Sequence, residues 1–123
     1  MDKPVIALDF DGVIANYDKW EDIHTHGAPM HGIKEFINSL RNKFYVLIYT
    51  CRTNPDIQKP YTFYKLKQIL QSYLFKHSIS YDEVYVGAGK PMAAFYIDDR
   101  AVLCNPQEDK NAFEKVLKQL GCE

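Results

Sequence analysis

Short apolar runs alternate with segments of helical periodicity along this chain. The apolar runs cover residues 5–8, 44–49, 84–86 and 93–97, and none of them places a polar residue at every second position. A strand with one face in water alternates in that way, whereas a strand covered on both faces is apolar throughout. These runs therefore predict buried strands of a parallel sheet. Residues 101–104 form a further short run and are a candidate fifth strand.

Three segments have apolar residues at positions i, i+3, i+4 and i+7, which is the period of an amphipathic helix. The third is punctuated by Asn105 as a cap, Pro106 as first helical residue and Gly121 after its last apolar position. Strands that alternate with helices are typical of an α/β fold. We predict a three-layer Rossmann-like fold with a mostly parallel central sheet. The three apolar stripes are Ile33, Phe36, Ile37 and Leu40; Leu66, Ile69, Leu70, Tyr73 and Leu74; and Phe113, Val116, Leu117 and Leu120.

The composition is that of a globular protein. The chain has 123 residues, 46% of them hydrophobic and 25% charged, and a net charge of −1. We expect one domain over residues 1–123 and no intrinsic disorder. The charge balance gives no reason to expect a nucleic-acid or membrane binder. No early apolar run reaches the ~7 residues of a signal-peptide core or the ~18 of a membrane span, so we expect a cytoplasmic protein with free cysteines.

Polar side chains follow the predicted strands. Asp9 and Asp11 come after the first run, Thr50 after the second, and Asp98 and Asp99 after the fourth. In a parallel sheet these positions share one edge, which is where α/β folds bind ligands. Lys90, just before the fourth run, is a further candidate for the same crevice.

Several carboxylates in one crevice need a positive partner. Two like charges ~4 Å apart repel by about 4 kcal/mol at an effective dielectric constant near 20. The donors are all oxygen atoms, which indicates a hard cation, and Mg²⁺ fits because it is held by one or two carboxylates, water and phosphate oxygens. The sequence therefore predicts a Mg²⁺-dependent phosphoryl site.

These residues resemble the four motifs of the haloacid dehalogenase (HAD) superfamily, in the same order and each at a strand end. The resemblance covers residues 5–99, about three-quarters of the chain. An Asp-x-Asp-Gly sequence alone is also used by calcium loops, but the four motifs together are specific. The matching segments are Asp9-Phe10-Asp11-Gly12-Val13, Thr50, Lys90-Pro91 and Tyr96-Ile97-Asp98-Asp99.

The resemblance implies a phosphatase that works through an aspartyl-phosphate. Asp9 is the implied nucleophile, and Asp11 the acid and then the base. Thr50 and Lys90 are implied to bind and stabilise the phosphoryl group. The implied Mg²⁺ ligands are Asp9, Asp11 through its backbone carbonyl, and Asp98, with Asp99 as support or a second ligand. The second acid favours phosphoester over carbon–halogen chemistry.

The intervals between the motifs leave no room for the cap domain of many HAD enzymes. A loop or flap over residues 16–30, a helix and a strand already occupy the first interval. We therefore expect a capless enzyme whose substrate is a nucleotide or other small organic phosphate. A phosphorylated macromolecule is the next candidate, and a homo-oligomer partner or the flap is a candidate cover for the open site.

Other interpretations stay open at this point. The acid pair, Thr and Lys also occur in receiver-type signalling modules, although in a different order along the chain, and a catalytically silent HAD-fold binding protein is a third alternative. Arg52 either binds a substrate phosphate or pairs with a surface acid. The histidines in and directly after the flap, His24, His26 and His31, match no standard zinc spacing, so their role is undefined.

Overall fold

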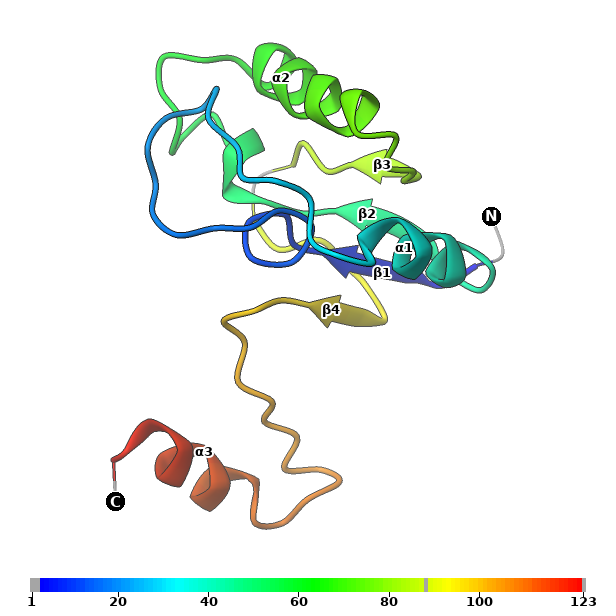
Figure 1. Cartoon of the computed structure of the whole chain (residues 1–123). Helices are drawn as coiled ribbons and strands as arrows, with labels where there is room; N and C mark the ends of the chain where they lie inside the picture. The colour runs from blue at the N-terminus through cyan, green and yellow to red at the C-terminus, as the bar shows by residue number, and fades with distance from the viewer. Residues whose placement is uncertain (1–2, 88, 123) are drawn as a thin grey trace.

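The computed structural model describes residues 3–87 and 89–122. Within them the centre is a four-stranded, all-parallel sheet in the order β3-β2-β1-β4 (Figure 1). The predicted α/β, Rossmann-like class is confirmed. The first predicted strand is correct in both bounds and the others are shorter than their apolar runs. The strands are β1 (Val5–Leu8), β2 (Tyr45–Ile48), β3 (Glu83–Val84) and β4 (Phe95–Ile97).

The register of the strands fixes what lies at the carboxyl edge of the sheet. Leu8 of β1 is paired with Ile48 on one side and with Ile97 on the other. The backbone N–H of Asp9 continues the ladder by donating to the carbonyl of Ile97 at 3.0 Å. The residues after β1, β2 and β4 therefore leave the sheet at one level and on neighbouring strands.

The helices are α1 (Ile33–Arg41), α2 (Phe63–Lys76) and α3 (Ala112–Leu120), with a short 3₁₀ helix, η1 (Cys51–Thr53), after β2. Thr62 caps the N-terminus of α2, since its side chain accepts a hydrogen bond from the N–H of Lys65 at 3.3 Å. Among the residues described, no helix is both long and apolar enough to cross a membrane.

The core lies between the sheet, α1 and α2. Alternate residues of β1 and β2 point to this side, because neighbouring side chains in a strand face opposite ways. Burial of each such side chain contributes about 1.5–3 kcal/mol. Ala7 and Leu47, on the opposite face, are also buried, and the chain between β3 and β4 runs behind that face in Figure 1. The central cluster includes Ile6, Leu8, Val46 and Ile48 from the strands, Ile33 and Ile37 from α1, and Leu70 and Leu74 from α2.

The two intervals in which many HAD enzymes carry a cap domain are filled here by these elements. Between Asp11 and Thr50 the chain forms the flap, α1 and β2. Between Thr50 and Lys90 it forms η1, α2 and β3. Both intervals thus build the sheet and its cover, and the parts of them that are described contain no separate folded unit.

Helix α3 stands apart from the rest of the molecule, at the end of an extended segment that follows β4 (Figure 1). The predicted start at Pro106 is wrong, because Asn105 accepts hydrogen bonds from the N–H groups of Glu108 and Asp109 and so closes a turn. The predicted end is correct, with Gly121 at φ 72°. The candidate fifth strand at 101–104 is also wrong, since these residues are in no strand.

Candidate metal centre

Three aspartates meet at the carboxyl edge of the sheet. Asp9 follows β1, and Asp98 and Asp99 follow the neighbouring β4. One carboxylate oxygen from each lies within 4.8 Å of the other two. Asp9 is half-buried at the base of this group, while Asp98 and Asp99 are exposed. Carboxylate oxygens that follow two adjacent strands are thus close enough together to bind one cation.

Burial and the two neighbouring acids change the pKa of Asp9. The pKa of Asp9 rises to about 7, chiefly because the carboxyl is buried and also because Asp98 and Asp99 are close. The N–H of Phe10, which donates to Asp9 Oδ1 at 2.8 Å, acts in the opposite direction. No lysine or arginine among the described residues pairs with these three acids. A cation from solution is therefore the natural partner of the cluster.

The donor set indicates which cation fits. All three groups are carboxylates, and hard divalent ions such as Mg²⁺ and Ca²⁺ prefer oxygen ligands. Two of the acids are exposed, so water and a substrate oxygen have access to an ion held there. A ligand set of this kind, open on one side, is suited to a metal that acts on a bound substrate.

The loop after β1 is wound tightly beneath the cluster. The carbonyl of Phe10 accepts hydrogen bonds from the N–H groups of Val13, Ile14 and Ala15 at 2.9–3.2 Å. Gly12 has a φ of 89°, and a Cβ there would lie 2.2 Å from Oδ2 of Asp99. Only glycine combines this backbone conformation with room for the Asp99 carboxylate.

Asp11 points to a different partner. Both of its carboxylate oxygens accept from Arg52, from Nε at 2.7 Å and from Nη2 at 3.0 Å. The Arg52 side chain is 5% exposed and that of Asp11 is 19% exposed. Arg52 Nη2 also donates to the carbonyl of Thr25 at 3.1 Å, while the buried Nη1 has no hydrogen-bond partner in the described part of the chain.

The Arg52 guanidinium lies between two aromatic rings. Its central carbon is 4.9 Å from the centroid of Trp20 and 5.4 Å from that of Phe10. The sequence alone leaves open whether its partner is a substrate phosphate or a surface acid. In the structure the partner is Asp11, a second predicted site residue, and the spacing of the two along the chain gave no signal for this pair.

Thr50 and Lys90 differ in how closely the structure brings them to this edge. Thr50 is buried directly after Tyr49, and its hydroxyl accepts the N–H of Arg52 at 3.2 Å. Lys90 is exposed, and its ammonium lies 4.3 Å from the centroid of the Tyr96 ring. Lys90 forms no ion pair with any described aspartate.

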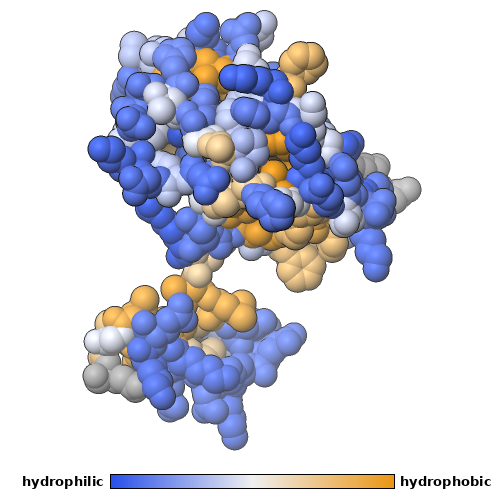
Figure 2. Space-filling model, viewed as in Figure 1, coloured by the Kyte–Doolittle hydropathy of each residue, from blue (hydrophilic) through white to orange (hydrophobic). Residues whose placement is uncertain are grey.

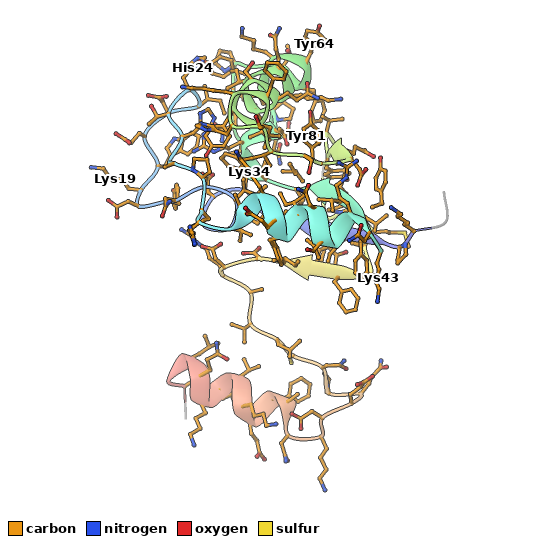
Figure 3. The ribbon with its side chains drawn as sticks, turned by 45° about the vertical axis from the view of Figure 1, so that its right-hand side comes forward. Lys19, His24, Lys34, Lys43, Tyr64 and Tyr81 are labelled. Atoms are coloured by element: carbon orange, nitrogen blue, oxygen red, sulfur yellow. The ribbon has the colours of Figure 1, made fainter. Side chains whose placement is uncertain are left out.

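The flap, residues 16–30, folds back towards α2. The Tyr73 hydroxyl donates to the carbonyl of Gly27 at 2.7 Å and so ties α2 to the flap. Figure 3 shows Lys19 at the outer side of the flap and His24 towards α2. The ring of His26 contacts those of Phe10 and Tyr73, which also contact each other. Within the residues described, no flap histidine belongs to a group that could hold a metal.

Comparison with known proteins identifies the fold without naming an activity. No family model matches the chain, and no curated protein matches it. A crystal structure of a structural-genomics target from Vibrio cholerae is similar, with 28% sequence identity and a TM-score of 0.53. The match covers 93% of this chain and 98% of that one. A bacterial protein of known structure therefore has this architecture along nearly its whole length.

Proposed function

We propose that this protein is a Mg²⁺-dependent phosphomonoester hydrolase of the HAD type, acting through an aspartyl-phosphate on Asp9. The observation that carries the proposal is the convergence of Asp9, Asp98 and Asp99 at the edge of a parallel sheet, with Asp11 on the adjacent loop. The motif resemblance supplies the reaction class. A nucleotide or other small organic phosphate is the proposed substrate, because the site is open and no cap is present in the described chain.

The proposed chemistry divides between two acids. Asp9 attacks phosphorus through a carboxylate oxygen, and the oxygen of the substrate alcohol leaves with its bonding electrons. Asp11 gives that oxygen a proton, and afterwards takes one from the water that hydrolyses the acyl phosphate. Mg²⁺ in the aspartate cluster would lower the pKa of Asp9 and offset the charge of the phosphoryl group.

Arg52 has a specific place in this scheme. While it is paired with Asp11, both oxygens of that acid are occupied as acceptors. Asp11 can carry a proton to the substrate only after one of these hydrogen bonds opens. We infer that the substrate phosphoryl group takes the place of Asp11 on Arg52, which frees the acid at the moment when it is needed. The unpartnered Nη1 of Arg52 supplies a further donor for this exchange.

The test is release of inorganic phosphate from a panel of phosphomonoesters, measured with Mg²⁺ and with EDTA. Turnover with Mg²⁺ should fall at least about 10³-fold in Asp9→Asn, since the amide has the shape of the acid but is a poor nucleophile. Asp56→Asn, at an exposed aspartate after η1, is the matched control and should leave the rate unchanged. Equal rates for Asp9→Asn and the native protein would contradict the covalent mechanism.

The lifetime of a phosphoryl group on Asp9 distinguishes a hydrolase from a receiver-type signalling module. A long-lived phosphoryl group on Asp9, formed from acetyl phosphate and stable over many minutes, would favour a receiver-type signalling role. Turnover that is lost with EDTA and regained with Mg²⁺ supports the hydrolase. Absence of both reactions would leave a binding protein as the better description.

A further inference from the structure

Helix α3 has an apolar face that its own chain leaves exposed. Phe113 is 65% exposed, Leu117 45% and Leu120 58%. These side chains lie on one side of the helix, which Figures 1 and 3 both show apart from the sheet. An isolated helix of this length is marginal in water, so its stability depends on a surface that covers this face.

The body of the molecule has a complementary hollow. A cavity of about 530 Å³ lies between the start of α1 and the end of β4, and most of its lining is apolar. Phe36 in this cavity is 42% exposed, and Phe95 on the edge strand β4 is 59% exposed. Figure 2 shows hydrophobic surface on the side of the body that faces the α3 lobe, and on the lobe itself. The full lining is Gly12, Val13, Met30, His31, Gly32, Ile33, Phe36, Ile97 and Asp99.

We propose that two copies of this chain exchange their α3 helices, each helix filling the cavity between α1 and β4 of the other copy. The apolar face of α3 and the cavity belong to the same chain. In a two-fold dimer each helix therefore covers the cavity of the other copy, and no apolar face stays exposed. The extended segment after β4 carries α3 away from its own body, as exchange requires (Figure 1). The occupant of the groove is therefore a second copy rather than an unrelated partner.

The area is sufficient for such a dimer. Large side chains each bury on the order of 150–250 Å² when fully covered. Five apolar side chains of each copy would lose their exposed surface in the dimer, and over the two copies this surface amounts to roughly 1,000 Å². They are Phe36, Phe95, Phe113, Leu117 and Leu120. The groove lining and a polar rim add to this, which brings the total into the range of about 1,200–2,000 Å² for stable interfaces.

Exchange would also complete the aspartate site. Asp99 and Gly12 line the cavity, so a helix seated there closes the cluster on its α1 side. It also covers β4, the strand that positions Asp98 and Asp99 and whose Phe95 and Tyr96 are exposed. This consequence rests on the proposed function, whereas the dimer itself does not.

The test is the mass of the full chain in solution by light scattering or sedimentation. The native protein should have twice the chain mass of 14.3 kDa. Leu117→Glu on α3 and Phe36→Glu in the groove should each give monomers, because each places a charge in every helix–groove contact. Phe75→Glu, at an 89% exposed position at the end of α2, is the control and should remain a dimer.

Mixing the two monomeric variants tests the exchange itself. The Phe36→Glu copy keeps an intact helix and the Leu117→Glu copy an intact groove, so the mixture should form a heterodimer through one sound contact. A native monomer, dimers in both variants, or a mixture that stays monomeric would each overturn the proposal. Mass is read without any substrate, so failure of the dimer and failure of the hydrolase are distinguishable.

Discussion

Asp9 and Asp11 are two residues apart on one loop, and the protein treats their charges in opposite ways. Asp11 is paired through both oxygens with Arg52, between the rings of Phe10 and Trp20. Asp9 faces two more acids, and no lysine or arginine among the described residues forms an ion pair with it. The charge of Asp11 is thus neutralised by an arginine of the protein, whereas that of Asp9 is available to a bound ligand.

We expect the Asp11–Arg52 pair to contribute to the stability of the fold, and the aspartate cluster to contribute to ligand binding at the expense of stability. A buried acid that has its own arginine is satisfied in the folded state, and loss of either partner leaves an uncompensated group. A cluster of like charges costs stability until a cation binds among them. Neutralisation of an acid should therefore have opposite effects in the two regions, which can be measured.

The largest expected change is on the Arg52 side. Arg52→Met should lower the free energy of unfolding by about 3 kcal/mol, because it leaves Asp11 partly buried without a partner. Urea denaturation measures this loss, and the double variant Arg52→Met with Asp11→Asn should recover part of it. The control is Arg41→Met in the more exposed Arg41–Asp82 pair, where a loss of about 1 kcal/mol or less is expected. Equal losses for the two arginines would show that Asp11 is not specially dependent on its partner.

The next effect concerns the loop that joins the two regions. Gly12→Ala should destabilise the protein by more than the roughly 1–2 kcal/mol of a left-handed backbone, because the new Cβ also meets the Asp99 carboxylate. Gly32→Ala has a similar φ of 82° and nothing within 4 Å of its Cβ, so it measures the backbone part alone. Displacement of Asp99 should weaken Mg²⁺ binding only in Gly12→Ala. If both variants titrate with Mg²⁺ like the native protein, Asp99 does not contribute to the site.

A smaller effect of opposite sign is expected in the cluster. Asp98→Asn should raise the stability of the metal-free protein by about 1 kcal/mol, since it removes one of three neighbouring like charges. The amide oxygen can still accept the N–H of Arg100, so the local turn is kept. Mg²⁺ should stabilise this variant less than the native protein in a thermal melt. Destabilisation of the metal-free form would show that the cluster is not under electrostatic strain.

The last effect is a pH dependence carried by Asp9. Its pKa is about 7 in the folded protein and near 3.8 when unfolded, so between these values the folded state holds a proton that the unfolded chain has lost. Stability from this group is therefore present below pH 3.8 and declines as the pH rises to about 7. Melting temperatures of metal-free native protein and Asp9→Asn, compared from pH 5 to pH 8, should show the extra decline only in the native protein. His26, whose pKa is lowered by burial, contributes in the opposite direction, but equally in both.

The sequence was informative wherever a pattern is local. The apolar run 5–8 is a strand with the expected bounds, and its parallel neighbours bring Asp9 and Asp98 together because register places the residues after paired strands side by side. Gly121 ends α3 as its backbone freedom suggests. These features depend on periodicity, strand direction and backbone chemistry, all of which are readable in a single chain.

The sequence was uninformative where the deciding contact is distant. Arg52 meets Asp11 only because the 3₁₀ helix after β2 turns back to the loop after β1, and no local pattern encodes that approach. Asn105 and Pro106 carry the signals of a helix start, but the same signals also build the turn that the structure has there. The position of α3 depends on what covers its apolar face, which its own residues do not specify.

The strand order also has a consequence for how the protein is made. β1 is central, and its two neighbours come from the middle of the chain and from near its end. While the chain is being synthesised, β1, β2, β3 and the helices α1 and α2 can already assemble the buried cluster. At that stage only Asp9 of the three acids is in place, because Asp98 and Asp99 have not yet emerged. The three-acid cluster on which the proposed metal site depends therefore exists only after β4 has docked.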